Sequence, residues 1–327
     1  MYLLENNCTD PAWNLALDEY LLTRFPREVL ALWRNGPSVI IGKNQNALEE
    51  IDLDFVRSRQ IPVVRRLTGG GAVFHDLGNL NYTLVQPCGT GDFNNYAKFT
   101  KPIVDFLATL GVEAALSGRN DLLVDGQKFS GNAQAVRGGR ILHHGTLLFS
   151  ADLSRLAGAL RPQAIKLESK GVKSVSSRVT NLAGHLPAPM EVEEFLERLR
   201  AYFLQTVSGL TPCTLTAADR AAVDDLCREK YRSWDWNFGA APRYTWSRAI
   251  KFPFGLVDAR LDVDHGIIRS AALYGDYFGR LDSAGLARRL VGLPHRREAL
   301  LPVLQTIPLW DYIAGCGPED LLALLCP

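Results

Sequence analysis

The sequence has almost no net charge, no closely spaced cysteine pair and no long apolar run. Its 36 basic and 35 acidic residues leave a formal net charge of +1 over 327 residues, so a general nucleic-acid-binding surface is not expected. None of the six cysteines forms a CxxC pair, which argues against a zinc site or a disulfide framework and favours reduced thiols in a cytosol. No run reaches about 18 apolar residues, so no membrane-spanning helix is expected.

The N-terminal segment also lacks the pattern of a targeting sequence. It carries Glu5, Asp10, Asp18 and Glu19, whereas signal peptides begin with a basic and then an apolar region and transit peptides are poor in acids. We therefore expect a cytoplasmic protein. The composition, 47% hydrophobic and 22% charged, is typical of a globular protein, and the length suits one large domain plus a small one.

Hydrophobic periodicity predicts an α+β fold with helices packed on a largely antiparallel sheet. Asp10 and Pro11 form a helix start, because an N-cap side chain precedes a proline that needs no N–H partner. Residues 121–149 read as a meander of three strands joined by tight turns, and such strands pair antiparallel. Residues 29–33 and 38–42 suggest a hairpin, and residues 61–67 and 80–85 a second strand pair. Further helices are predicted at 103–110, 191–207 and 216–230.

A domain boundary is expected near residues 245–252. After the aromatic stretch WDWNFGAAPRYTW the chain restarts with an alternating hairpin and then leucine-rich helices. We predict a large domain at 1–246 and a small α+β accessory domain at 247–327. The sequence shows no alternating βαβ pattern, which argues against a Rossmann fold.

The stretch RRLTGGGAVFHD raises the main functional question. We call residues 68–76 the glycine loop; it fits neither a dinucleotide fingerprint nor a Walker A motif. Glycines let a backbone approach a ligand closely and can present N–H groups to an anion, but a plain turn would look the same. Arg65 and Arg66 lie on a strand and point to opposite faces, so at most one can reach a site beside the loop.

Other segments carry weaker signals. Asn120 and Asp121 could serve a nucleotide and a hard cation such as Mg²⁺, or simply form a polar turn. Lys128 near the start of a strand could face an anion, or be an ordinary edge lysine. The histidines show no metal-ligand spacing. His143 and His144 should point to opposite faces of a strand, so we expect them to be structural or supporting residues.

The order of these segments resembles the lipoate–protein ligase family over the whole chain. The segments are RRLTGGGAVFHDLGNLNYTL, SGRNDLLV, KFSGNAQA, HHGTLLFSADLSRL, KGVKSVSSRVTNL and WDWNFGAAP. The resemblance implies the catalytic fold shared with biotin–protein ligases and, more distantly, class II aminoacyl-tRNA synthetases. It also implies ATP-dependent activation of lipoate to lipoyl-AMP with release of pyrophosphate, then transfer to a lysine of a lipoyl domain.

The same resemblance assigns site residues. Lys128 matches the family's active-site lysine and is the expected catalytic residue, and Asp121 is the candidate Mg²⁺ ligand. The lipoate-binding residues implied are Arg66, Thr68, Gly69, Gly70, Gly71, Ala72, Val73 and His75. The ATP- or adenylate-binding residues implied are Phe74, Asn120, Asp121, Lys128, Gly145, Thr146, Lys173 and Arg178, the last two from a loop that folds over the adenylate.

The chemistry of the reaction explains this set. Lipoate is already ionised at neutral pH, so adenylation needs no general base but must bring two anions together. Lys128 can lie between them and offset their repulsion, while Mg²⁺ neutralises the triphosphate. The expected ligands are ATP, Mg²⁺ and lipoate, with no tightly bound prosthetic group. The expected partners are lipoyl domains of E2 subunits or glycine cleavage H protein, with no nucleic acid and no membrane, and the chain is expected to be a monomer.

Two alternatives remain at this point. A lipoyl or octanoyl transferase of the same fold would act from preformed adenylate or through a cysteine thioester, but no cysteine lies between Cys88 and Cys213, where most of the motifs are. A non-catalytic binder of lipoyl domains would not need Lys128 or the three glycines.

Overall fold

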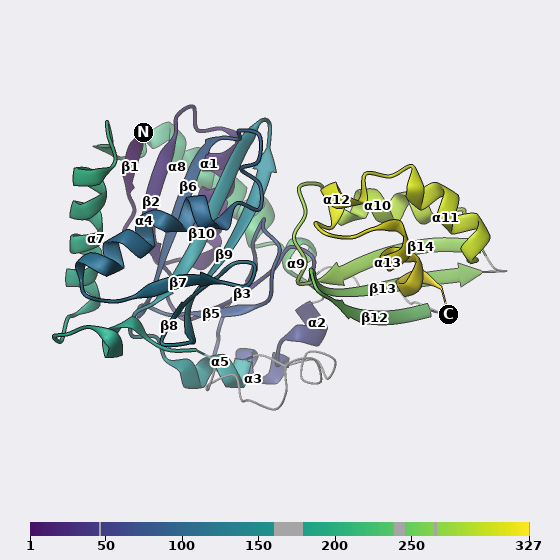
Figure 1. Cartoon of the computed structure of the whole chain (residues 1–327), viewed down its shortest axis with the longest axis horizontal. Helices are drawn as coiled ribbons and strands as arrows, with labels where there is room; N and C mark the ends of the chain where they lie inside the picture. The colour runs from purple at the N-terminus through teal and green to yellow at the C-terminus, as the bar shows by residue number, and fades with distance from the viewer. Residues whose placement is uncertain (46, 160–178, 239–245, 265–266, 327) are drawn as a thin grey trace.

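A computed structural model describes residues 1–45, 47–159, 179–238, 246–264 and 267–326, and its centre is an eight-stranded sheet (Figure 1). The strand order is β11-β1-β2-β6-β10-β9-β8-β7. β1 pairs parallel with β2 and β11, whereas the other neighbours in this order are antiparallel, as predicted. The bounds are β1 Tyr2–Glu5, β2 Val29–Arg34, β6 Asn79–Pro87, β7 Ala114–Ser117, β8 Asp121–Val124, β9 Gln127–Arg137, β10 Arg140–Leu148 and β11 Thr211–Cys213.

A second, smaller sheet carries the glycine loop. Its strands β4 (Val63–Arg65), β3 (Ser38–Ile41) and β5 (Val73–His75) lie in that order, with β3 parallel to β4 and antiparallel to β5. The predicted hairpin of β2 with β3, and the predicted pairing of β4 with β6, are therefore wrong. β2 and β6 pair with each other instead. Apolar residues of β3, β4 and β5 pack in a cluster of their own, so this sheet has a core distinct from the cores on either face of the large sheet.

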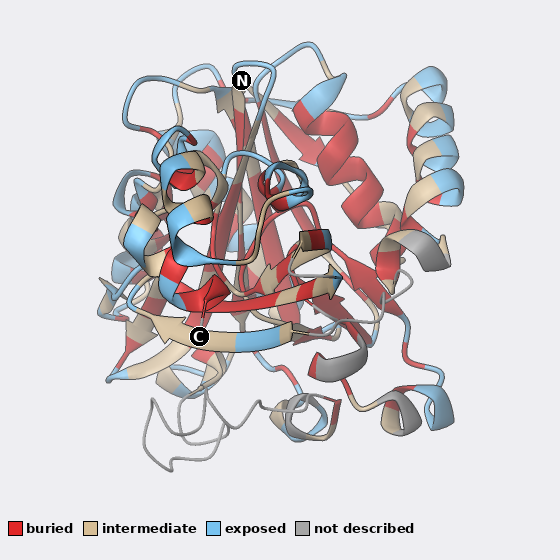
Figure 2. Cartoon of the chain, turned by 90° about the vertical axis from the view of Figure 1, so that its right-hand side faces the viewer, coloured by how far each residue is buried: buried red, intermediate tan, exposed pale blue. Residues whose placement is uncertain are grey.

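Helices cover both faces of the large sheet. On one face lie α1 (Pro11–Thr23) and α8 (Ala217–Leu226), followed by the π-helical turn η3 (Cys227–Tyr231). On the other face α4 (Tyr96–Thr109) and α7 (Val192–Thr206) pack through Phe106 and Phe195. Figure 2 shows that the strands at the centre of the molecule are largely buried. The predicted helices near 103–110, 191–207 and 216–230 are confirmed as α4, α7 and α8 with η3.

The predicted start of α1 is also confirmed. The Asp10 carboxylate accepts a hydrogen bond from Ala12 N at 3.0 Å, and Pro11 is the first helical residue. The remaining short helical elements of the large unit are α2 Ala47–Glu50, α3 Leu53–Ser58, α5 Leu153–Ala159, η2 Leu182–His185 and α9 Trp234–Asn237.

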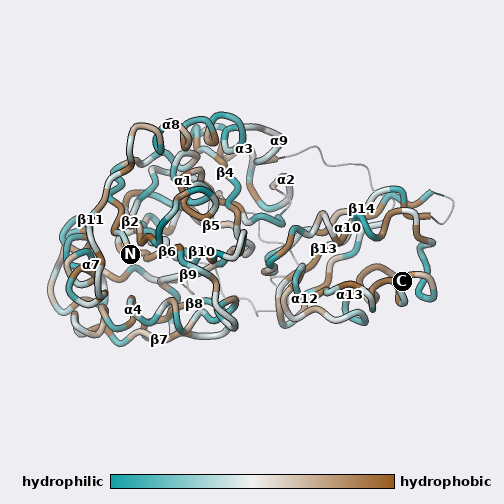
Figure 3. The backbone as a smooth tube through the Cα atoms, turned by 90° about the horizontal axis from the view of Figure 1, so that it is seen from above, coloured by the Kyte–Doolittle hydropathy of each residue, from teal (hydrophilic) through white to brown (hydrophobic). Residues whose placement is uncertain are grey.

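The C-terminal part of the chain forms a separate unit beside the large one (Figures 1 and 3). An antiparallel sheet of β12 (Trp246–Phe252), β13 (Gly255–Asp264) and β14 (Ile267–Gly275) packs its apolar face against helices and so has its own core. The helices are α10 Ser283–Leu290, α11 Arg297–Gln305, α12 Leu309–Tyr312 and α13 Pro318–Leu325. Within the described ranges, no helix has both the length and the apolar character needed to cross a membrane.

Candidate functional site

A cavity lies where the glycine loop faces the large sheet. Ten residues that the sequence singled out line this cavity: Arg66, Gly69, Gly70, Gly71, Val73, His75, Asn120, Lys128, Gly145 and Thr146. The lining also contains residues that the sequence did not single out: Leu15, Trp33, Ile40, Asn81, Gly131, Asn132, Ala133 and His144. Apolar side chains from α1, β2, β3 and β9 thus meet polar ones from β9 and β10 in one pocket.

Four expected site residues lie outside this lining. Phe74 is buried in the apolar cluster of the small sheet, and Ala72 packs against that cluster. Thr68 is buried behind the cavity wall, and Asp121 is ion-paired with Lys128. Lys173 and Arg178, expected to contact the adenylate, fall outside the described residues.

The two neighbouring arginines have different environments. Arg65 donates to the backbone carbonyls of the segments before α2 and within α9, and so ties those segments to β4. Arg66 donates to Gly69 O at 2.7 Å and Gly71 O at 2.8 Å, which fixes the glycine loop from within. Burial lowers the pKa of both guanidinium groups to about 10, so both remain charged at neutral pH. As expected from strand geometry, only Arg66 faces the cavity.

The glycines of the loop have distinct roles. Gly70 has φ +96°, and a Cβ there would lie 2.8 Å from Arg66 Nη2, so a side chain would strain the backbone and crowd the arginine. A Cβ on Gly71 would have no atom within 4 Å, because this residue faces the open cavity. Across the cavity, a Cβ on Gly145 would lie 2.2 Å from Asn132 Oδ1, so β9 and β10 can approach only with glycine here.

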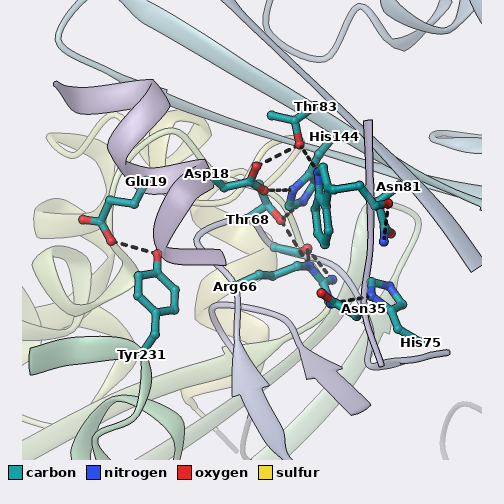
Figure 4. A network of polar contacts seen from close by, with 12 residues as sticks. Asp18, Glu19, Asn35, Arg66, Thr68, His75, Asn81, Thr83, His144 and Tyr231 are labelled. Atoms are coloured by element: carbon teal, nitrogen blue, oxygen red, sulfur yellow. Dashed lines mark hydrogen bonds and ion pairs between the residues drawn. The ribbon is translucent and has the colours of Figure 1, made fainter. Parts of the chain in front are cut away.

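One hydrogen-bonded chain links the glycine loop to α1 (Figure 4). Arg66 Nε donates to Thr68 Oγ1 at 3.1 Å, Thr68 Oγ1 lies 2.7 Å from His144 Nε2, and His144 Nδ1 lies 2.8 Å from Asp18 Oδ2. An arginine can only donate. A carboxylate can only accept, so His144 donates from Nδ1 to Asp18; in that tautomer of the neutral ring, Nε2 accepts the proton of the Thr68 hydroxyl, whose oxygen also accepts from Arg66.

The same carboxylate also holds the opposite wall. Trp33 Nε1 donates to Thr83 Oγ1 at 2.9 Å, and Thr83 Oγ1 donates to Asp18 Oδ1 at 2.8 Å. Asp18 thus receives hydrogen bonds from both directions, and it is almost fully buried. Because Trp33 and His144 both line the cavity, Asp18 fixes two of its walls without lining it.

His75 is buried at the edge of the small sheet. Asn35 Nδ2 lies 3.1 Å from His75 Nδ1, and the indole of Trp33 contacts the imidazole edge-on at 6.3 Å between centroids. Burial, reinforced by the positive charge of Arg66, lowers the pKa of His75 to about 3. The imidazole is therefore neutral under ordinary conditions.

Lys128 lies at the more open part of the cavity. Its ammonium forms an ion pair with Asp121 Oδ1 at 2.8 Å, and its side chain is 35% exposed. Its backbone carbonyl accepts from Thr180 N at 2.9 Å, so the chain that follows the undescribed residues 160–178 returns beside this lysine. Gly131 leaves room for the side chain, since a Cβ there would be 3.1 Å from Lys128 Nζ.

Asn120 and Asn132 form a reciprocal clamp between the turn before β8 and strand β9. Asn120 Nδ2 donates to Asn132 O at 2.6 Å, and Asn132 Nδ2 donates to Asn120 O at 3.1 Å. The Tyr82 hydroxyl donates to Asn132 Oδ1, and burial raises the pKa of this phenol far above its ordinary value. Two polar amides therefore hold fixed positions next to Lys128.

The C-terminal unit touches the glycine loop directly. A Cβ on Gly69 would lie 2.2 Å from Tyr277 O, so the loop after β14 packs against this glycine backbone to backbone. The Arg119 guanidinium lies 4.3 Å from the ring centroid of Phe278 and donates to Phe254 O. Arg119, which directly precedes Asn120 and Asp121 in the chain, thus contacts the C-terminal unit.

Comparison with known proteins identifies the family. Residues 10–204 match the lipoyl protein ligase A/B catalytic domain, and residues 241–325 match the bacterial lipoate protein ligase C-terminus. Two curated relatives are each 40% identical over 99% of both chains: lipoate-protein ligase LplJ of Bacillus subtilis (strain 168) and lipoate–protein ligase 1 of Staphylococcus aureus (strain Mu50). The chain belongs to the lipoate–protein ligase family.

Solved structures agree with this family assignment. The crystal structure of P. falciparum LipL1 in complex with lipoate is 26% identical, covers 94% of each chain and superposes with a TM-score of 0.78. A lipoate-protein ligase A bound with ATP is 29% identical over 73% of this chain and 98% of its own, with a TM-score of 0.64. The bipartite ligase of Thermoplasma acidophilum, described with its E2 lipoyl domain, is 30% identical over 75% and 98%, with a TM-score of 0.66.

Residues that sequence reasoning missed come from segments far from the glycine loop. Leu15 is one of several apolar residues of α1 and Trp33 lies in the buried strand β2, so neither carries a local sequence signal for a ligand site. His144, for which the sequence predicts a structural or supporting role, lines the cavity. Its neighbour His143 points to the other face, as expected, and stacks on Phe99 at 5.1 Å.

No cysteine lines the cavity among the residues that the structure describes. All six cysteines are free. Burial raises the pKa of the thiols of Cys8, Cys213 and Cys227, which makes thiolate formation harder. Cys88 follows the end of β6, where Cys88 N donates to Gly139 O. These positions do not suit a thioester nucleophile facing the cavity.

Proposed function

We propose that this chain is an ATP-dependent lipoate–protein ligase that forms lipoyl-AMP and then transfers the lipoyl group to a lysine of a lipoyl domain. The observation that supports this most is a single cavity with two kinds of lining. Lys128 lies at its open part, and the apolar side chains of Leu15, Trp33 and Ile40 line its buried part. Such a cavity suits a ligand with a carboxylate at one end and an apolar body.

In adenylation, Lys128 holds the two reacting anions together. Its ammonium is a compact point charge that can contact the lipoate carboxylate and the α-phosphate at once. In the structure, this ammonium is ion-paired with Asp121 Oδ1 at 2.8 Å. The Lys128–Asp121 ion pair therefore opens when the ligands bind. No residue needs to remove a proton in this step, because the attacking carboxylate is already ionised.

The residues beside Lys128 also suit a metal-bound triphosphate. Mg²⁺ at such sites is held by one or two carboxylates together with phosphate oxygens, and Asp121 supplies one carboxylate next to the expected phosphate position. Among the described residues no cluster of three acidic, cysteine or histidine ligands forms a complete cage. We propose that Asp121 would hold Mg²⁺ brought in with ATP, where the metal would supply charge neutralisation for the pyrophosphate.

The remaining assignments form part of the same proposal. Residues 1–246 would carry adenylation and transfer, and residues 247–327 would be an accessory domain. The acceptor would be a lipoyl domain of an E2 subunit or glycine cleavage H protein, and the ligase would act as a monomer in the cytoplasm, in keeping with its six free cysteines.

The test measures lipoyl-AMP formation and pyrophosphate release by the purified chain with ATP, Mg²⁺ and lipoate. Lys128→Ala should lower adenylation by about 10²-fold or more, the scale of losing a preorganised charge at a reacting centre. Lys101→Ala is the matched control, since Lys101 is ion-paired with Asp105 at 2.7 Å on the exposed face of α4. Adding synthetic lipoyl-AMP separates adenylation from transfer. Near-normal pyrophosphate release by Lys128→Ala would contradict the assignment.

A further inference from the structure

Within the cavity, His75 has one polar atom that nothing in the described structure satisfies. His75 Nε2 is buried without a hydrogen-bond partner, and the whole residue is only 4% exposed. The other ring nitrogen, Nδ1, contacts Asn35 Nδ2 (Figure 4). Because buried polar groups are nearly always paired, an unpaired one in a cavity wall points to a ligand atom that completes it.

The surrounding amides determine which nitrogen of His75 carries the proton. Asn14 Nδ2 lies 2.9 Å from Cys8 O and 3.1 Å from Arg34 O, and two carbonyl oxygens can face only an amide nitrogen. The same Nδ2 also lies 2.8 Å from Asn35, which must therefore present its oxygen there. The amide nitrogen of Asn35 then faces His75 and donates to Nδ1.

His75 therefore has its proton on Nε2. A neutral imidazole has one donor and one acceptor nitrogen, and the hydrogen bond from Asn35 makes Nδ1 the acceptor. The low pKa of the ring, about 3, agrees with the neutral form. A doubly protonated ring would set two N–H groups against each other at Asn35. The cavity wall thus presents a neutral N–H donor.

The Nε2–H donor of His75 lies in the part of the cavity where the dithiolane ring of lipoate is expected. Lys128 is 35% exposed at the open part of the cavity, whereas His75 is buried beside Trp33. A lipoate whose carboxylate lies at Lys128 therefore directs its dithiolane ring towards the buried wall. Sulfur is a weak hydrogen-bond acceptor, but the methylene and methyl groups of a straight-chain acid accept none.

We infer that His75 is a specificity-determining residue that donates from Nε2–H to a dithiolane sulfur of lipoate and disfavours octanoate. This inference rests on the proposed ligase function. Octanoate would displace water from the donor and leave it unpaired, whereas lipoate supplies a partner. Since leaving a buried donor unsatisfied is what costs free energy, we expect a selectivity for lipoate over octanoate of roughly tenfold from this contact.

The test compares adenylation of lipoate and octanoate by the full chain and two variants. His75→Phe keeps a flat ring but removes the donor, and should reduce the lipoate-to-octanoate ratio of kcat/KM roughly tenfold. His75→Gln places an amide N–H donor near the position of Nε2 and should retain most of the ratio. If His75 only filled space, the donor of glutamine would give no advantage over phenylalanine. An unchanged ratio in His75→Phe would overturn the inference.

A second measurement keeps the inference testable if His75→Phe fails to fold. In the wild-type chain with ¹⁵N-labelled histidine, NMR should show His75 as the neutral Nε2–H form. Saturating lipoate should shift the Nε2–H resonance more than saturating octanoate. An Nδ1–H form, or equal shifts, would overturn the inference. If the wild-type chain makes no acyl-adenylate from either acid, the proposed ligase function fails instead.

Discussion

Replacing Gly71 with alanine should separate the stability of the glycine loop from its ability to receive a ligand. Gly71 does not have the left-handed φ of Gly70, and a Cβ there meets no atom within 4 Å. Glycine-to-alanine changes at such positions restrict mainly the unfolded chain, so the free energy of unfolding should stay constant or rise by about 0.4–1 kcal/mol. The added methyl group nevertheless projects into the cavity that lipoate would occupy.

Gly70→Ala is the matched control one residue away. Its φ of +96° is unfavourable for alanine, and the new Cβ would lie 2.8 Å from the buried Arg66 guanidinium. Backbone strain of this kind costs on the order of 1–3 kcal/mol. Gly70→Ala should therefore lower the free energy of unfolding, whereas Gly71→Ala should not.

Urea unfolding and the lipoate dependence of pyrophosphate release measure the two effects. Gly71→Ala, which adds one carbon atom, should raise KM for lipoate, and Gly71→Val, which adds three, should raise it by roughly tenfold or more, since even one extra methylene group in a close-fitting pocket has an effect of this size. The reasoning would be refuted by a stable Gly71→Val protein with the original KM. It would also be refuted if Gly71→Ala lost as much stability as Gly70→Ala.

Three further predictions concern charge, thiols and pH. Lys128→Arg should lose most adenylation while remaining folded, because a planar fork cannot replace a compact ammonium; pyrophosphate release close to wild type would contradict this. A folded variant without cysteine, and Cys88→Ser alone, should still make and transfer lipoyl-AMP, whereas a lipoyl thioester trapped at Cys88 by mass spectrometry would favour the transferase alternative. Burial lowers the pKa of His75 and His143 to about 3, so the unfolded state binds more protons than the folded state between about pH 3 and 6.5. The free energy of unfolding should therefore fall as the pH drops through this window, by up to ~1.4 kcal/mol per pH unit for each histidine. Urea titrations at several pH values should show a smaller fall for His75→Phe than for the wild-type chain. The same dependence of unfolding free energy on pH in both proteins would refute this prediction.

Local signals in the sequence determined the elements whose partners are close in the chain. The start of α1 follows from the Asp10 cap and the proline after it, which depend only on neighbouring backbone groups. The antiparallel meander of β8, β9 and β10 follows from tight turns that leave strands no other direction. The opposite directions expected of the adjacent side chains of Arg65 and Arg66 likewise predicted that at most one of them reaches the site, and only Arg66 lines the cavity.

Pairings between distant strands could not be read in the same way. The sequence suggested that β2 pairs with β3 and β4 with β6, because each pair is close in the chain. In the structure β3 and β4 pair in a second sheet, where their apolar residues pack with those of α2 and α3. Which apolar strand pairs with which depends on the faces that can be buried together, and no local pattern contains that information.

The site shows the same division. The glycine loop, Lys128 and Asn120 were recognisable from the sequence because each lies in a short motif. The chain from Asp18 through His144 to Thr68 joins three segments 50 or more residues apart, and only folding brings these polar groups within hydrogen-bonding distance. The sequence by itself determined which residues the cavity could use. The tertiary structure decided which atoms face it, because burial, tautomer and hydrogen-bond direction depend on neighbours that are remote in the chain.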